Sequence, residues 1–125
     1  MNLYEQIGGE SAVATLCRCF YQIMQDSQTT QAILAMHPSN LTSSEKKLFL
    51  FLSGWLGGPN LYIEKYGHPR LRARHLPFSI GIAERDQWLY CMREAIASLE
   101  LEPTLSQTLY TAFADLADFM RNQHE

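Results

Sequence analysis

His75 is the residue whose sequence surroundings point most directly to chemistry. It follows the arginine-rich run Arg70–Arg74 and precedes the apolar run Leu76–Phe78. Cations therefore lie on one side of the imidazole and apolar groups on the other, and Pro77 ends any short helix there. A single histidine held in this way suits axial ligation of an iron in a flat, amphipathic cofactor, whose carboxylates the arginines would bind through charge-assisted hydrogen bonds. Taken alone, these residues favour a simpler interpretation, a surface histidine beside a solvated arginine run.

Tyr21 and Trp88 are the two aromatic residues that could add hydrogen-bond donors to such a site. Tyr21 lies beside the apolar stripe of its expected helix, and the indole of Trp88 is a donor only, so each needs an acceptor when it is buried. For both residues, ordinary helix packing is the simpler interpretation. The same holds for Leu48, Phe51 and Leu52, which are typical core residues.

Other catalytic and metal-binding patterns are missing from the sequence. It contains no GxSxG, P-loop, HExxH or GxGxxG motif, and its histidines, His37, His68, His75 and His124, include no i, i+4 pair. A two-histidine metal site on one helix is therefore unsupported. A Cys–His nucleophile pair stays open, although the cysteines lie within helical stripes, where cysteine is usually inert packing. Because there is no CxxC spacing, we expect free thiols in a reducing compartment.

The composition is that of a single globular domain spanning residues 1–125. Of the 125 residues, 46% are hydrophobic and 18% are charged, and the formal net charge is −3. An acidic chain disfavours nucleic-acid binding, which depends on contacts between cations and phosphates. No signal peptide is visible, and no run approaches the ~18 apolar residues of a membrane span. We therefore expect a soluble, cytoplasmic protein with neither a nucleic-acid nor a membrane partner.

Helical periodicity dominates the chain and predicts an all-α fold with four long helices and short connectors. Apolar stripes with i, i+3, i+4 spacing run from Val13 to Met24, Leu48 to Trp55, Trp88 to Leu99 and Leu109 to Met120. A short opening turn is expected at Leu3–Ile7 and a short helix at Ile33–Met36. We also expect a capping box at Thr42–Glu45, and Pro103 at the start of the last helix. Residues Asn60–Pro77 break the pattern, and a loop of that length in a small domain is usually functional.

Taken together and in order, these segments resemble the second group of the truncated haemoglobin family. The resemblance runs from Leu3 to about Met120. The motifs that carry it are Leu3–Gly9, Phe20-Tyr21, Gly57–Pro59, His68–Phe78 and Glu84–Met92. It implies a globin-like two-over-two helical sandwich around a haem, which we take as haem b.

The resemblance also implies a role for each candidate residue. His75 would be the proximal iron ligand, and Tyr21 and Trp88 would face the bound gas on the opposite, distal side. The residues in contact with the haem would be Lys47, Leu48, Phe51, Leu52, Tyr62, Arg72, Arg74, His75, Phe78, Ile80, Trp88 and Met92. Within this set, Lys47, Tyr62, Arg72 and Arg74 fall where the family contacts the haem propionates.

Two further positions belong to the distal side of the family pattern. Ser44 falls at the gate position, where a small side chain leaves a route for ligand entry. His37 falls where the family often has a tyrosine or phenylalanine, but the stretch between Tyr21 and His37 is a few residues longer than the family pattern. A distal-pocket position and a solvent-facing corner therefore both stay open for His37.

The function that this resemblance implies is reversible binding of oxygen and related diatomic ligands at a five-coordinate haem iron. Two donors aimed at the partial negative charge of the ligand imply slow oxygen release, because each such bond contributes ~1.5–3 kcal/mol. One alternative is a haem enzyme, nitric oxide dioxygenase-like or peroxidase-like, that works with an external reductase. Another is a helical ligand-binding module without haem. The protein would act as a monomer or a homodimer.

Overall fold

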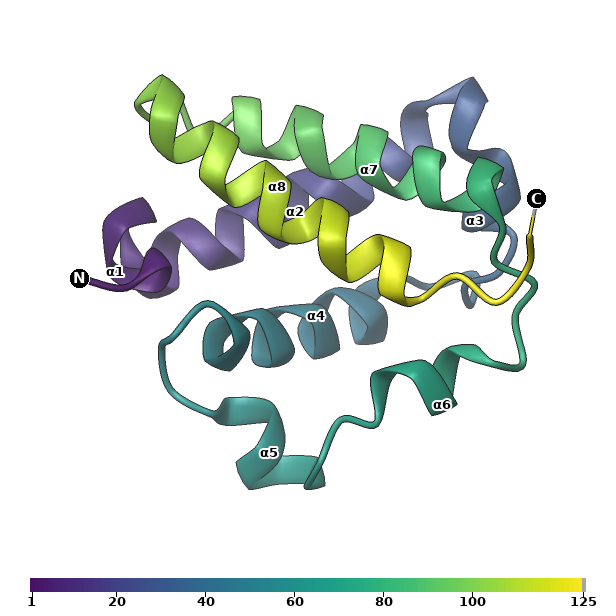
Figure 1. Ribbon diagram of the computed structural model, residues 1–125, viewed down its shortest axis with the longest axis horizontal. Helices are drawn as coiled ribbons and strands as arrows, with labels where there is room; N and C mark the ends of the chain where they lie inside the picture. The colour runs from purple at the N-terminus through teal and green to yellow at the C-terminus, as the bar shows by residue number, and fades with distance from the viewer. Residues whose placement is uncertain (125) are drawn as a thin grey trace.

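The computed structural model describes residues 1–124, which contain helices and connectors but no strand (Figure 1). The long helices are α2 (Gly9–Asp26), α4 (Thr42–Trp55), α7 (Ile82–Ala97) and α8 (Pro103–Phe119). The short helices are α1 (Leu3–Ile7), the 3-10 helix η1 (Gln28–Thr30), α3 (Gln31–Leu34), α5 (Leu61–Tyr66) and α6 (Leu71–His75). The predicted all-α class with four long helices is therefore confirmed.

The long helices pack as two pairs. Helix α2 packs against both α4 and α7, and α7 packs against α8. In Figure 1, α2, α7 and α8 lie together, whereas α4, α5 and α6 form the opposite side of the molecule. The pairs α2 with α4 and α7 with α8 form the predicted two-over-two sandwich. Within residues 1–124, no helix combines the length and the apolar character that crossing a membrane would require.

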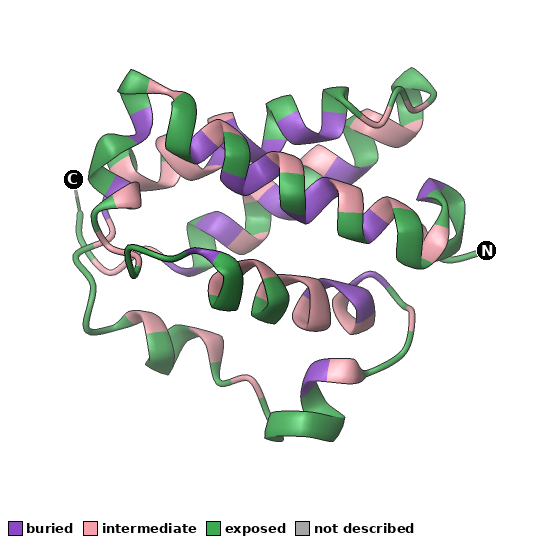
Figure 2. Ribbon diagram, turned by 180° about the vertical axis from the view of Figure 1, so that it is seen from behind, coloured by how far each residue is buried: buried purple, intermediate pink, exposed green. Residues whose placement is uncertain are grey.

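The core lies where the apolar stripes of α2, α7 and α8 meet (Figure 2). Leu16 and Phe20 of α2, Met92 of α7 and Phe113 of α8 are each almost completely buried. In Figure 2 the buried residues of these helices face inward, whereas α5 and α6 are largely exposed. The apolar stripes therefore build the upper part of the sandwich, while α5 and α6 gain little from burial.

The three cysteines are free thiols, as predicted. Cys17 and Cys91 are buried in the core. Burial raises the pKa of Cys17 to about 12 and that of Cys91 to about 11. Both thiols are therefore protonated, unreactive packing groups at neutral pH.

Helix α1 is docked on the end of α4 by close backbone contacts. The Tyr4 amide donates to the Leu56 carbonyl at 3.0 Å, and Asn2 Nδ2 donates to the Gly57 carbonyl at 2.8 Å. A Cβ atom added at Gly58 would lie 2.6 Å from the Tyr4 ring, so only glycine fits there. The glycine pair Gly57-Gly58 after α4 therefore lets α1 pack closely against the end of that helix.

The expected capping box at Thr42–Glu45 is wrong. Thr42 is the first residue of α4, and the preceding Leu41 has no capping side chain. The Thr42 amide bonds instead to Asn40 Oδ1 at 2.9 Å, so a residue before the predicted box provides the acceptor. The glutamate contact that is typical of a capping box occurs instead at the start of α7, where the Gly81 amide donates to Glu84 Oε1 at 2.7 Å.

Two other local expectations are corrected by the structure. The short third helix was expected at 33–36, but α3 spans Gln31–Leu34 and directly follows η1. Its start is fixed by Thr30, whose buried hydroxyl donates to the Met24 carbonyl at 2.9 Å. The segment Asn60–Pro77 was expected as a loop but contains α5 and α6, which are too short to show a periodic apolar stripe.

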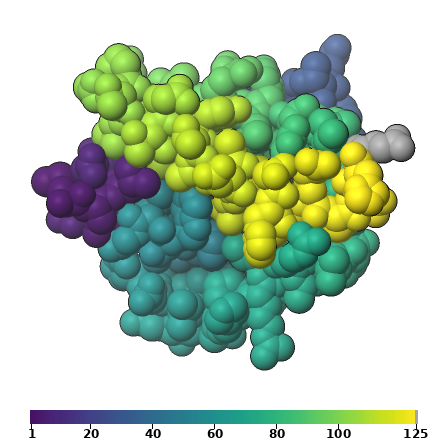
Figure 3. Space-filling view, in the orientation of Figure 1, coloured from purple at the N-terminus to yellow at the C-terminus, as the bar shows by residue number. Residues whose placement is uncertain are grey.

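The chain beyond α8 turns back over the connector between α6 and α7. The amides of Asn122 and Gln123 both donate to the Ile80 carbonyl, at 2.9 and 3.1 Å. Figure 3 shows these C-terminal residues, in yellow, lying against the green segment that follows α6. Backbone hydrogen bonds therefore join the residues after α8 to the connector between α6 and α7.

Candidate functional site

His75 is the last residue of α6, and the backbone of its own helix fixes its ring. Nδ1 lies 2.6 Å from the Leu71 carbonyl oxygen. Because a carbonyl only accepts, Nδ1 must carry a proton. In the neutral ring, Nε2 then holds the lone pair and is the nitrogen available to a metal. The local geometry of α6 therefore prepares His75 as a single nitrogen ligand.

Large apolar side chains around His75 are exposed. Leu76 is 57% exposed, Phe78 is 40% exposed, and Ile82 at the start of α7 is 40% exposed. Ile80 between them is half-buried. Exposed apolar surface of this size in the segment that follows His75 is what a planar, apolar group would cover.

Helix α4 carries aromatic side chains that contact α5 and α8. Phe51 stacks on Trp55 with ring centroids 6.3 Å apart and meets Tyr62 of α5 edge-on at 6.4 Å. Trp55 in turn contacts Phe113 of α8 at 5.1 Å. Of the other predicted contacts, Leu52 and Met92 are buried and Leu48 is half-buried. These side chains form an apolar wall between α4, α5, α7 and α8.

Tyr21 of α2 and Trp88 of α7 are brought together through Phe20. The Phe20 ring meets Tyr21 edge-on at 5.0 Å and Trp88 at 5.2 Å. Trp88 also lies against Phe113, with ring centroids 6.0 Å apart. Two donors far apart in the sequence are thus held in one aromatic cluster, which fixes their rotamers by packing.

Neither donor has a partner within residues 1–124. The Tyr21 hydroxyl and the Trp88 indole form no hydrogen bond there. Among those residues, Arg121 Nε alone is a fully buried side-chain atom without a partner, so the two donor atoms are not completely buried. Burial, with smaller contributions from Cys17 and Glu45, raises the pKa of Tyr21 well above its usual range. Tyr21 is therefore a neutral hydroxyl with a proton to donate at any pH near neutrality.

His37 lies beside Tyr21, in the connector between α3 and α4. Its ring meets the Tyr21 ring edge-on, with centroids 5.7 Å apart. His37 Nδ1 lies 2.7 Å from the Ile33 carbonyl oxygen and therefore carries a proton, which leaves Nε2 as an acceptor in the neutral ring. Ser44, also half-buried, lies in the first turn of α4.

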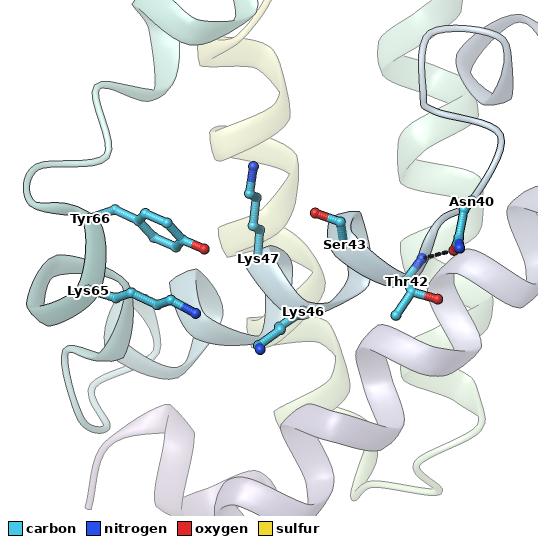
Figure 4. A pocket seen from close by; sticks show the side chains of 7 residues that line it. All are labelled: Asn40, Thr42, Ser43, Lys46, Lys47, Lys65 and Tyr66. Carbon is cyan, nitrogen blue, oxygen red and sulfur yellow. Dashed lines mark hydrogen bonds between the residues drawn. The ribbon is translucent and has the colours of Figure 1, made fainter.

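Lys47 belongs to a cationic surface pocket between α4 and α5 (Figure 4). The pocket has a volume of about 440 Å³. Its lining residues are Asn40, Thr42, Ser43, Lys46, Lys47, Lys65 and Tyr66. Lys47 and Lys65 approach the Tyr66 ring, with Nζ 5.9 and 5.4 Å from its centroid. Residues 46–74 contain three lysines and three arginines but one acidic residue, Glu64, so this side of the molecule is positive.

The two candidate arginines of α6 differ in their surroundings. Arg72 Nη1 donates to the carbonyls of Phe119 and Arg121, at 2.7 and 3.0 Å. This guanidinium therefore ties α6 to the end of α8. Arg74 is exposed and lies one residue before His75.

Sequence reasoning missed two kinds of residue. Trp55 and Phe113 were assigned only to core stripes, although they link Phe51 to Trp88 across the site. Asn122 gave no signal, yet its side chain bonds to backbone atoms of residues 75–80. The stripes could have suggested the aromatic link, whereas nothing in the sequence indicates where an asparagine near the end of the chain folds back.

The bacterial-like globin family model matches residues 2–122, and the chain therefore belongs to this family of globins. Its relatives place it in one subgroup. Over 122 residues it is 40% identical to group 2 truncated hemoglobin YjbI of Bacillus subtilis, a match that covers 98% of this chain and 89% of the relative.

Two solved structures share both the fold and the sequence. The cold-adapted truncated hemoglobin of the Antarctic marine bacterium Pseudoalteromonas haloplanktis matches with a TM-score of 0.95 and 42% identity, over 99% of this chain and 100% of that one. The group II 2-on-2 hemoglobin of Agrobacterium tumefaciens matches with a TM-score of 0.94 and 42% identity, over 99% and 96% of the two chains. The predicted membership of the group II truncated haemoglobins is confirmed, and the chain is a haem-binding globin.

The residues described here fit a haem. His75 Nε2 is left available as a ligand, and the apolar side chains that flank it are exposed. On α2 and α7, Tyr21 and Trp88 hold donors without a protein partner. A globin controls its iron through an axial ligand, apolar side chains that contact the haem, and hydrogen-bond donors on the distal side.

Proposed function

We propose that the protein binds haem b through His75 and uses it to bind oxygen and related diatomic ligands reversibly, with slow oxygen release. Haem iron, when bound, supplies reversible ligand binding and leaves partial negative charge on the outer atom of an oxygen ligand. His75 would hold the iron through Nε2, and the bound haem would supply an iron that takes up a diatomic ligand on the side of Tyr21 and Trp88. The single observation that carries the proposal is the His75 Nδ1 contact of 2.6 Å to the Leu71 carbonyl, which leaves Nε2 for the metal.

The distal residues of this chain select for oxygen by donating hydrogen bonds to the bound ligand. Tyr21 stays neutral because burial raises its pKa, so its hydroxyl donates rather than acting as an anionic ligand. Trp88 can only donate. Both donors are held on the Phe20 ring, so little reorganisation is needed when a partly negative atom arrives.

The cations of α4 and α6 orient the haem. Lys47, in the cationic pocket, and Arg74, which precedes His75 in the sequence, would bind the haem carboxylates at the edge of the site, with Tyr62 adding a hydroxyl. Arg72 acts there with part of its guanidinium while Nη1 holds the end of α8. The side chains that would pack on the porphyrin are Leu48, Phe51, Leu52 and Met92 of the apolar wall, together with Phe78 and Ile80.

His37 and Ser44 complete the distal side. Neutral His37 accepts at Nε2 and its ring packs on Tyr21, so it lies where it can orient the Tyr21 hydroxyl. Ser44 at the start of α4 leaves room for a gas to enter because its side chain is small.

The proposal is tested by purifying the protein and recording its ferrous spectrum with and without oxygen. We expect a red protein with a five-coordinate ferrous spectrum that converts reversibly on addition of oxygen. A purified protein that takes up no haem when it is supplied would overturn the proposal.

The enzymatic alternative is favoured by one observation, the placement of His37. A peroxidase needs an acid–base group on the distal side, and the half-buried His37 beside Tyr21 is such a group. Stopped-flow consumption of nitric oxide or peroxide, with a chemical reductant replacing the reductase partner, tests it. Turnover that depends on His37 would favour the enzyme, and binding without turnover would favour the carrier or sensor. The three free cysteines suit a reducing compartment such as the cytoplasm in either case.

A further inference from the structure

The helix that carries His75 has almost no packing of its own. Helix α6 spans five residues, none of them buried. It starts after Arg70, which adopts a left-handed conformation with φ 48°. A helix this short is not stable in isolation, because the nucleation cost is not recovered over one turn. Something outside α6 must therefore hold it in place.

Asn122 provides that restraint on the C-terminal side of His75. Its Nδ2 donates to the Phe78 carbonyl at 2.7 Å and to the His75 carbonyl at 3.3 Å. Its Oδ1 accepts from the Ile80 amide at 2.9 Å. One side chain thus binds three backbone groups of residues 75–80, while its own amide donates to the Ile80 carbonyl at 2.9 Å.

The segment that carries Asn122 is itself anchored to the rigid part of the molecule. Asp118 of α8 accepts from Arg85 of α7 at 2.8 Å and from Arg121 at 3.1 Å. Arg72 Nη1 adds a second link between α6 and the carbonyls of Phe119 and Arg121. These ion pairs and hydrogen bonds connect α7 through α8 to the C-terminal residues, and the C-terminal residues to α6 and the segment that follows it.

We propose that Asn122 is a positioning residue for His75, setting the position of the imidazole relative to the haem by fixing the backbone that follows it. This inference rests on the proposed role of His75 as the iron ligand. The Leu71 carbonyl sets the orientation of the imidazole ring, and Asn122 sets the position of the His75 backbone and therefore of the ring. Without Asn122 the His75–Ile80 backbone samples several positions, so the bond from iron to histidine is weakened and the haem leaves faster.

Two substitutions separate the contacts of Asn122. Asn122→Ala removes the donor and the acceptor together. Asn122→Asp keeps an acceptor for the Ile80 amide but loses the donor to the His75 and Phe78 carbonyls. Gln123→Ala is the matched control, because Gln123 contacts Ile80 through its main-chain amide and, within residues 1–124, its side chain bonds only to Asn122 Oδ1, at 3.4 Å.

Three measurements follow the effect. The iron–histidine stretching band in the resonance Raman spectrum of the ferrous protein reports the bond directly. Haem transfer to an apo-acceptor reports retention, and hydrogen exchange at the Ile80 amide in the haem-free protein reports the restraint without haem.

We expect Asn122→Ala to shift or broaden the iron–histidine band and to speed haem transfer about 2- to 12-fold, the equivalent of one ordinary hydrogen bond. Its Ile80 amide should exchange faster by a similar factor. Asn122→Asp should show the altered band with near wild-type Ile80 exchange, and Gln123→Ala should match wild type throughout. Circular dichroism checks that helix content is retained in each variant.

The outcomes distinguish this inference from the proposed function. A wild-type protein that binds haem without an iron–histidine band overturns the ligand assignment, and the inference with it. A normal wild-type band that is unchanged in both Asn122→Ala and Asn122→Asp overturns the inference alone. If Asn122→Ala does not fold, an unchanged band in Asn122→Asp is sufficient to reject it.

Discussion

Removing the two distal donors one at a time gives the most informative prediction about ligand binding. Tyr21→Phe deletes one oxygen atom and keeps the ring that packs on Phe20 at 5.0 Å and on His37 at 5.7 Å. Trp88→Phe keeps an aromatic group between Phe20 and Phe113. Since neither donor has another partner within residues 1–124, each substitution removes the bond to the ligand and leaves no protein group unpaired.

The size of the effect follows from the charge of the acceptor. A hydrogen bond to a charged group contributes ~1.5–3 kcal/mol, so losing one should speed oxygen release about 10- to 150-fold. Carbon monoxide carries less charge when bound, and its release should change by no more than about twofold. The double variant should show less than the sum of the two single effects, because both donors serve one ligand and the survivor can shift.

Stopped-flow replacement of oxygen by carbon monoxide measures the first rate, and replacement of carbon monoxide by nitric oxide measures the second. Tyr90→Phe is the matched control, since Tyr90 lies on the same helix as Trp88 and contacts Arg93. Equal acceleration of both gases would mean that the substitutions alter access to the site, and unchanged oxygen release would refute the assignment of Tyr21 and Trp88 as donors.

Three further predictions concern His37, haem retention and stability. His37→Phe should change the rate of oxygen release, because it removes the ring nitrogen that can orient the Tyr21 hydroxyl and keeps an aromatic ring beside Tyr21; an unchanged rate would place His37 outside the site. Arg74→Ala and Arg72→Ala should each speed haem transfer about two- to fivefold without loss of helix content, and added salt should speed it in wild type; unchanged transfer would leave both arginines as solvated residues. The raised pKa of Cys17 means that its thiol ionises first in the unfolded chain, so Cys17 should lower the free energy of unfolding above pH 9.0 with a slope approaching about 1.4 kcal/mol per pH unit, to which Cys91 adds its own contribution. Urea unfolding from pH 7 to 10.5 measures that slope, which should be shallower in Cys17→Ala; an equal slope in the two proteins would contradict the shift.

Periodicity was sufficient to predict the parts of the fold that bury apolar stripes. The stripe of α2 from Val13 to Met24 is buried as expected, and Pro103 opens α8. Where burial does not determine the local structure, the prediction from the sequence was wrong, as at the start of α4. Asn40 rather than Thr42 caps the start of α4, because either residue can supply the acceptor and only the path of the connector selects between them.

The candidate site was predictable in its residue types but not in its restraints. His75, Tyr21 and Trp88 could be named from their motifs, whereas the packing of Tyr21 and Trp88 on Phe20 and the restraint on the backbone after His75 depend on the tertiary fold. The contact of Nδ1 with the Leu71 carbonyl is local and helical, so it follows from the position of His75 at the end of α6. The bonds from Asn122 to residues 75–80 cross more than 40 positions in the sequence and leave no local signature.

The central claim, that His75 holds the haem iron, is tested most directly by His75→Gly. Glycine removes the only nitrogen that α6 offers as a side-chain ligand beside the exposed Leu76 and Phe78, while the apolar wall of α4 still retains part of the haem. The ferrous five-coordinate spectrum and its iron–histidine band should disappear, and added imidazole should partly restore both by filling the space left by the side chain. A His75→Gly protein with the ferrous spectrum of wild type would contradict the account.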